Sequence, residues 1–365
     1  MLEFLQNNQW IIGALVLGAI ILTVMVMFLY PMVRGSFNQI AANTTFSTYE
    51  RVTKLTPLGI GKDNTRLCDY YIASSAYSVF PGTTTQDYIS DDVVVKVIKA
   101  GARLIELDIY AGDNDTPVVG LKNEQMGYNY ALNSVDFESC CVAVANTAFN
   151  SVDTPLSSDP FIVSLVFHTD KRNVMDAAAE ILKTTCQRFM LGPEYAYTRK
   201  NLAQEPMSTL MSKLILVSGG NIKGTNIEEL VNLSWSTSNL RRLTYMQASQ
   251  PYDQDELINS NRTNITMVVP DPEPDLKNNN PTILFTYGCQ WNLMNYGSLD
   301  DMQAINIGTF QDGSIILKPV DLRYKPIEAK SPVLPDPATH SFQPMSQQSP
   351  IYDTDPKTGQ KSITI

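Results

Sequence analysis

The sequence has little clustered positive charge. Its 365 residues include 27 Lys and Arg against 37 Asp and Glu, which gives a formal net charge of −10. The basic residues form no cluster, whereas binding to nucleic-acid phosphates or to anionic lipid headgroups depends on clustered Lys and Arg. The composition therefore argues against nucleic acid as the main partner, and against attachment to a membrane through a polybasic segment.

Patterned cysteines and the common catalytic motifs are also missing. The five cysteines show no CxxC spacing and are odd in number, which fits neither a zinc site nor a disulfide framework. We expect them to be buried, small apolar side chains. The chain has no Gly-rich phosphate loop, no GxSxG sequence and no HExxH sequence, so it lacks the sites that these motifs form.

One long apolar run lies near the N-terminus. Residues 10–33 contain no charged residue, and such a run matches the roughly 20 apolar residues that cross a bilayer core. Trp10 and Tyr30 stand where aromatic side chains gather at the two membrane interfaces. The alternative is a cleaved signal peptide, but the first nine residues lack Lys and Arg and no A-x-A site follows. We predict a retained, single membrane-spanning helix that has the lipid bilayer as its partner.

Strand-like and helical patterns alternate after this run. Strand patterns occupy residues 70–75, 102–110, 161–168 and 213–220, and amphipathic helical patterns occupy 91–101 and 173–190. This alternation predicts βαβ units and a parallel sheet. Residues 34–62 show no sustained period and are expected to form a stalk. Residues 221–240 are rich in Asn, Ser and Thr and are expected to form a linker.

Several segments resemble the catalytic barrel of phosphoinositide-specific phospholipase C. The X half of that family resembles residues 67–80, 93–119, 159–168 and 210–220, and the Y half resembles residues 256–270 and 288–319. The last of these segments is the most specific, since it keeps the family's order and spacing at Cys289-Gln290, Asn295, Met302-Gln303, Asn306, Gly308, Phe310 and Leu317-Lys318-Pro319. The resemblance runs from Asn64 to about Tyr324.

The resemblance implies an α/β fold, a distorted TIM barrel with its ligand pocket at the C-terminal ends of the strands. A transmembrane helix precedes the barrel. The expected parts are a short N-terminal segment (1–9), the membrane helix (10–33), the stalk (34–62), an X-like half-barrel (63–220), the linker (221–240), a Y-like half-barrel (241–324) and a Pro-rich tail (325–365). Seven of the 21 prolines lie in the last 40 residues, so this tail is expected to be disordered or an extended strap on a partner.

The family's catalytic residues are absent at the matching positions. The resemblance implies two catalytic histidines and a calcium ion, but Ala76 and Asn123 stand at the histidine positions. The two histidines of the chain, His168 and His340, match neither position. Tyr77 and Val166 replace metal ligands of the family. The lysines that hold inositol phosphates become Val217 and Gly219, and the arginine and tyrosine of the Y half become Met267 and Val269.

Glu106 and Asp108 are what remains of the family's metal site. They lie two residues apart on an expected strand, so both side chains point to the barrel interior. Two carboxylates are well short of the six to eight oxygen ligands that calcium prefers. The interpretation that competes with a residual divalent-cation site is a relict pair held by backbone amides or by a nearby basic group, such as Arg103 on the same face. His168 is expected to be a structural side chain.

These losses predict a catalytically inactive barrel without a cofactor, anchored in a membrane as a structural or interaction module. Val166, Val217 and Val269 are expected to make the pocket mouth apolar. Protein partners would bind the barrel surface and the Pro-rich tail, and the architecture suits a minor capsid or virion membrane protein of a large DNA virus, in contact with capsid proteins. Two alternatives stay open: a divalent-metal-dependent phosphodiesterase with a site rearranged around Glu106, Asp108 and Asn123, and a binding module for an uncharged ligand.

Overall fold

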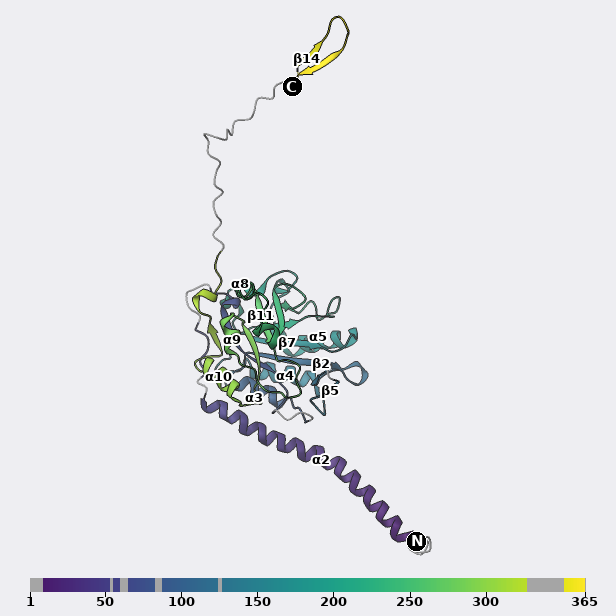
Figure 1. The fold of residues 1–365 in the computed structure, drawn as a ribbon. Helices are drawn as coiled ribbons and strands as arrows, with labels where there is room; N and C mark the ends of the chain where they lie inside the picture. Colours follow the sequence, from purple (N-terminus) through teal and green to yellow (C-terminus); the bar gives the residue numbers. More distant parts are fainter. Residues whose placement is uncertain are drawn as a thin grey trace. The chain divides into compact units, whose positions relative to one another are not determined.

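The computed structural model describes residues 9–52, 55–59, 65–82, 87–123, 127–326 and 351–364. One compact unit spans Met1–Tyr324, and a second spans Lys325–Ile365 (Figure 1). His340 lies outside the described residues.

The first unit is a parallel barrel surrounded by helices. Its eight parallel strands are hydrogen-bonded in the order β10-β11-β12-β1-β2-β7-β8-β9. In this part of the chain no pairing joins β9 to β10, so the barrel is nearly closed. The strands are β1 (Tyr70–Ala76), β2 (Leu104–Ala111), β7 (Phe161–Phe167), β8 (Leu214–Ser218), β9 (Leu233–Ser234), β10 (Leu240–Thr244), β11 (Ile265–Val269) and β12 (Trp291–Asn295). The predicted distorted TIM barrel is confirmed.

Shorter strands and helices complete this unit. Antiparallel β13 (Ile315–Leu317) pairs with the start of β1, and β3 (Pro117–Val119) pairs with β2 and with β6 (Val135–Asp136). β4 (Lys122–Asn123) and β5 (Tyr128–Asn129) form a separate pair. The helices are α3 (Asp92–Lys99), α4 (Phe137–Thr147), α5 (Arg172–Cys186), α6 (Met207–Leu210), α7 (Tyr245–Ser249), α8 (Gln254–Asn261), α9 (Thr282–Thr286) and α10 (Asp301–Thr309).

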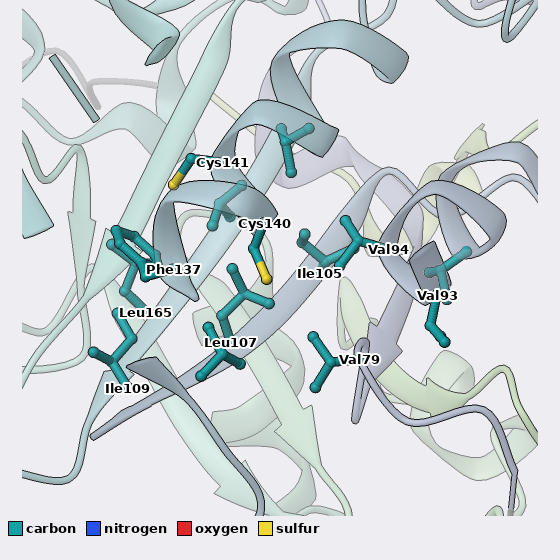
Figure 2. Packing of buried hydrophobic residues seen from close by; sticks show 14 of the residues in the cluster. Val79, Val93, Val94, Ile105, Leu107, Ile109, Phe137, Cys140, Cys141 and Leu165 are labelled. Carbon is teal, nitrogen blue, oxygen red and sulfur yellow. The ribbon is translucent and has the colours of Figure 1, made fainter. Parts of the chain in front are cut away.

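The core follows from the alternation of side chains along the strands. On β2, Ile105, Leu107 and Ile109 point outward and pack with α3 and α4, whereas Leu104 belongs to the barrel interior. Figure 2 shows this outer layer, in which Val94 of α3 and Phe137 and Cys140 of α4 lie beside the strand residues. Each such buried side chain contributes about 1.5–3 kcal/mol through removal of apolar surface from water. All five cysteines are free and buried, as predicted.

The N-terminal helix α2 (Gln9–Val52) is longer than predicted. It continues without a break through residues expected to form an irregular stalk. The reason is tertiary packing, because Ala42, Phe46 and Tyr49 recur at helical spacing and are buried against the barrel. The preceding apolar part is exposed, and α2 is long and apolar enough to cross a membrane, a test that a signal sequence also passes.

Two other expectations for irregular segments need correction. Within residues 221–240, expected to be a linker, β9 forms and pairs in parallel with β8, so this segment supplies a barrel strand. In the tail, β14 (Ile351–Thr354) and β15 (Lys361–Thr364) form an antiparallel hairpin. Asp355 closes its turn by accepting a hydrogen bond from the Lys357 amide at 2.8 Å, and Gly359 has the positive φ of 68° that such a turn favours. Residues 327–350 lie outside the described residues.

Candidate functional site

A cavity of about 240 Å³ opens at the C-terminal ends of the barrel strands. The open end of a parallel barrel is the usual place for a ligand site, and the sequence predicted a pocket there. Side chains from β1, β2, β10 and β11 and from the loops beyond the strands line it. The lining residues are Ala76, Tyr77, Glu106, Asp108, Leu121, Lys122, Asn123, Tyr130, His168, Arg242, Thr244, Val269, Pro270 and Pro272.

Glu106 reaches the cavity from β2 and forms an ion pair with Arg242. The Arg242 Nη2 donates to Glu106 Oε1 at 2.9 Å, and the Ser164 hydroxyl donates to Oε2 at 3.1 Å. The carboxylate side chain is only 8% exposed, so an unpaired charge here would be costly. Both of its oxygens have a hydrogen-bond donor from the protein itself.

Asp108, two residues further along β2, contacts His168. The His168 Nε2 and Asp108 Oδ1 are 2.7 Å apart. The imidazole stacks on Tyr110, with ring centroids 4.6 Å apart and planes within 7°. The backbone amide of His168 donates to the carbonyl of Ile109 at 2.8 Å, which fixes the end of β7 against β2. The prediction that His168 is a structural side chain stays a prediction, but the structure places it at the cavity.

Arg242 is the basic residue that the sequence reasoning missed. It lies on β10 directly across from Met267 of β11 in the strand register. Met267 stands where we expect the family's arginine, and the neighbouring strand places a guanidinium at the cavity. The guanidinium also lies 5.4 Å from the Trp235 ring, and its Nε is buried with no hydrogen-bond partner among the described residues. Although burial alone would lower the pKa of Arg242, the carboxylate of Glu106 raises it above the ordinary value.

The sequence carried a partial signal for Arg242. Two consecutive arginines occur on one short strand, so one must face the barrel interior and the other the outside. Arg241 takes the outer position and pairs with Glu256. The sequence analysis places residues 241–324 in the Y-like half-barrel but predicts no strand at Leu240–Thr244.

Arg103, the basic partner expected from the sequence, lies elsewhere. Its guanidinium is fully buried and donates to the backbone carbonyls of Ala148, Asp159 and Pro160 at 2.9–3.2 Å. Arg103 precedes β2 by one residue and stands three positions from Glu106, and a two-residue period places those two side chains on opposite faces. The expectation that Arg103 would neutralise the carboxylates is wrong.

Ala76 and Asn123, which we predict to stand at the family's catalytic histidine positions, both line the cavity. Ala76 ends β1, and Tyr77 follows it with a φ of 52°, in the left-handed region that asparagine enters more readily than tyrosine. Burial raises the pKa of Tyr77 above its ordinary value. Asn123 donates from Nδ2 to the Tyr130 hydroxyl at 2.9 Å, and Tyr130 in turn donates to the carbonyl of Glu273.

The expectation of an apolar mouth is wrong for two of the three valines. Val269 lines the cavity, but Val217 is fully buried in the barrel interior and Val166 is not among the lining residues. Polar and charged side chains that no family motif specifies, including Lys122 and Thr244, supply much of the wall. At Gly219, a Cβ would collide with the Trp235 indole, so this ring fills the place of a longer side chain.

The residues at the cavity do not fit a calcium ion. Calcium requires six to eight oxygen ligands, and Tyr77 and Val166 stand where we expect the family's other ligands. Glu106 and Asp108 already have basic partners within 3 Å. Among the described residues no group of three or more His, Cys, Asp or Glu side chains could hold a metal ion.

Comparison with known families agrees with the geometry. The family described as phosphatidylinositol-specific phospholipase C, X domain, matches residues 64–218, which contain β1 to β8. The barrel is therefore similar to this family over its first half, and its fold is phospholipase C-like. The matched residues of this phospholipase C-like barrel include β1, β2 and β7 beside the cavity. Residues beyond the matched region supply β10 and β11.

Solved structures show the same fold. PLC21 from L. pealei superposes with a TM-score of 0.60 and 19% identity over 74% of this chain and 40% of that chain. PLC21 from S. officinalis gives a TM-score of 0.60 and 18% identity over 74% of this chain and 39% of that chain. The phospholipase C-like chain thus spans about two fifths of the length of those proteins. Comparison with curated proteins gives no significant match.

Proposed function

We propose that this chain is a catalytically inactive phospholipase C-like barrel, anchored in a membrane by α2 and used as a structural or interaction module. The observation that carries the proposal is the pairing of both remaining carboxylates with basic side chains of the same chain. Arg242 neutralises Glu106, and His168 contacts Asp108. These contacts occupy the groups that a phosphodiesterase of this family would use to bind its metal.

The missing acid and base support inactivity independently. A positioned general acid or base typically contributes 10²–10⁴-fold to the rate, so loss of both raises the barrier by roughly 5–10 kcal/mol. Ala76 has no group that can transfer a proton, and the amide of Asn123 does not titrate in the range of a histidine. Tyr77 is no substitute for the general base at neutral pH, because burial keeps its hydroxyl protonated.

Membrane attachment is supported by the composition of α2. Its first half presents large apolar side chains to its surroundings, with Trp10, Met27 and Phe28 each at least 70% exposed. Contiguous apolar surface of this kind marks a membrane or protein interaction site. Residues 10–33 carry no charge, so a helix of this length inserted into a bilayer leaves no charged group in the hydrocarbon.

The interaction role follows from what the barrel keeps. A barrel without the catalytic histidines that the family resemblance implies still offers a rigid surface, and the Pro-rich tail offers a further segment for a partner. A connector between a membrane and a protein shell would need these parts. The placement in the virion of a large DNA virus, with capsid proteins as partners, stays a prediction from the sequence.

A turnover assay tests the proposal directly. The full chain, in mixed micelles of detergent and phosphatidylinositol, should release no inositol phosphate with or without millimolar calcium, while an active phospholipase C does so under the same conditions. Turnover by the wild-type chain that disappears in Glu106→Ala would refute inactivity. It would favour instead the rearranged, metal-dependent phosphodiesterase.

A second candidate function is binding of a small polar ligand without turnover. The observation that favours it is the buried, unpartnered Nε of Arg242 at the cavity, since such a group gains a hydrogen bond when a ligand supplies an acceptor. The sequence predicted an uncharged ligand for an apolar mouth. Because the cavity wall is polar, we propose a polar ligand instead. A rise in melting temperature with inorganic phosphate or inositol, absent in Arg242→Met, would support this candidate.

A further inference from the structure

The direction of α2 along the barrel is set by its contacts with α3. Gln39 Nε2 donates to Asp92 Oδ2 at 3.0 Å, at the first residue of α3. One turn further, Asn43 and Phe46 share a groove with Lys96, and Ser47 shares it with Lys99 at the end of α3. The two helices therefore run in the same direction. Because α3 follows β1, it begins at the cavity end of the barrel, and α2 also runs from that end to the opposite end.

After α2 the chain contacts the N-terminal ends of the barrel strands, opposite the cavity. We call this side of the barrel the closed end, or closed face. Leu55 lies so close to Gly101, just before β2, that a Cβ there would come within 2.8 Å of its side chain. The amide of Leu58 donates to Asp159 Oδ1 at 2.9 Å, just before β7. Both neighbours precede the strands, so they mark the face opposite the cavity.

The other end of the docked part of α2 lies at the cavity rim. Arg34 Nη2 contacts Asp87 Oδ2 at 2.8 Å in the loop after β1. The amide of Asp87 donates to the carbonyl of Tyr130, whose side chain lines the cavity. Residue 34 is also the first charged residue after the uncharged run 10–33. Arg34 is therefore linked to the cavity wall through two contacts, from Arg34 to Asp87 and from Asp87 to Tyr130.

We propose that α2 holds the barrel with its cavity mouth turned toward the lipid headgroups, so that the rim loops form a surface for a bilayer. This rests on the proposed function, since it requires that residues 10–33 span the membrane. Arg34, the first charged residue after this run, contacts Asp87 in the loop after β1. The bilayer boundary at residue 33 then lies at the level of the rim, not of the closed face.

The compact unit ends on the closed face. The amide of Tyr324 donates to Asp69 Oδ1 at 2.7 Å, and the Arg66 guanidinium stacks 3.5 Å over the Tyr324 ring. Asp69 immediately precedes β1, so the last residue of the unit lies at the N-terminal ends of the strands. The chain thus enters the barrel unit from the mouth side and leaves it from the face that we place away from the bilayer.

Two matched cysteine variants test the orientation in the full chain. Leu132 lies at the rim, where its amide donates to the carbonyl of Asp87, and Val152 lies near the closed end, beside the Lys99–Asp153 ion pair. Both side chains are apolar and exposed, at 50% and 90%. Leu132→Cys and Val152→Cys would each be labelled with the same fluorophore and reconstituted in phosphatidylcholine vesicles that contain a lipid with a spin-labelled headgroup. Wild-type protein, with its buried thiols, measures background labelling.

We expect the headgroup spin label to quench the label at position 132 several-fold more than the label at position 152. Equal quenching, or stronger quenching at position 152, would overturn the orientation while membrane anchoring still stood. Flotation of each variant with the vesicles is measured in the same samples. Failure of the wild-type chain to float would refute the membrane anchor and the orientation together, so the two failures are distinguishable.

Discussion

The two ends of the barrel differ in how many residues of the family pattern they keep. At the open end, Ala76, Tyr77 and Asn123 stand where the resemblance implies catalytic and metal-binding residues. The carboxylates that remain there, Glu106 and Asp108, pair with Arg242 and His168. At the closed end, Gln290 and Lys318 belong to the segment that carries the family's order and spacing, and both make structural hydrogen bonds. The resemblance therefore survives where residues hold the backbone together, and it fails where residues would contact a substrate.

Gln290 shows what the closed end preserves. Its fully buried amide accepts from the Thr266 amide at 2.9 Å and donates toward the carbonyls of Cys68, Asn261 and Asn264 at 2.8–3.1 Å. One side chain thus ties together the segments before β1, β11 and β12. Lys318 adds to the same cluster by donating to the carbonyl of Asn261 at 2.8 Å.

The largest expected effect is therefore at Gln290. Gln290→Leu removes these hydrogen bonds and leaves buried backbone groups without partners, which should lower the free energy of unfolding by about 5 kcal/mol. Lys122→Ala at the open end serves as the control and should cost about 0.5 kcal/mol, since this exposed side chain only lies over the Tyr110 ring. Denaturant titration of both variants checks the comparison. A similar loss in the two variants would contradict it.

Much of the fold could be predicted because it depends on local patterns. Alternation along β2 places Glu106 and Asp108 inside the barrel, and helical spacing identifies α3 and α5. The partners of the two carboxylates could not be predicted in this way. Arg242 is 136 residues from Glu106 and His168 is 60 residues from Asp108, so their contacts exist only after the barrel closes.

The extent of α2 was missed for a different reason. Its buried positions, Ala42, Phe46 and Tyr49, are separated by Asn, Thr and Ser residues that are weak helix formers. Helical propensity alone does not favour a helix there, and burial against the barrel overrides it. The apolar run before residue 34 was clear from composition, because no tertiary contact is needed to recognise it.

The second prediction concerns the charge at the closed end. Burial lowers the pKa of Lys318 to about 8 from an ordinary value of 10.5. As the pH rises, Lys318 therefore loses its proton at a lower pH in the folded state than in the unfolded state. Between pH 8 and pH 10.5 the unfolded chain binds more protons at this site, and stability rises with pH. Relative to Lys318→Met, the free energy of unfolding of the wild type should increase by about 3 kcal/mol over this range. Denaturation at a series of pH values measures the difference, which cancels most of the titration of cysteines and tyrosines. A difference independent of pH would show that this lysine is not held in an unfavourable environment.

A smaller effect is expected from the ion pair at the open end. Arg242→Met leaves Glu106 buried without its basic partner and should destabilise the fold by about 2 kcal/mol, less than a fully buried pair because Arg242 is 27% exposed. Glu106→Gln in the same chain removes the orphaned charge and should recover part of the loss. The double-mutant cycle, measured by denaturant titration at neutral pH, gives the coupling between the two side chains. Additive losses would mean that the pair does not hold the cavity together.

The smallest effect is expected where α2 meets the barrel. The Tyr49 hydroxyl donates to the carbonyl of Tyr296 at 2.9 Å and accepts from Gln303 Nε2 at 3.0 Å. Tyr49→Phe keeps the stacking on Phe46 and Tyr296 but loses both hydrogen bonds, so the free energy of unfolding should fall by about 1 kcal/mol. Since Gln303 belongs to the segment with the clearest family spacing, this contact shows a retained residue used to dock a helix. Hydrogen exchange should then rise in residues 42–52 of the variant and stay unchanged in β1 and β12. Faster exchange across the whole barrel would contradict this, because it would mean that α2 is part of the cooperative core and not an element added to its surface.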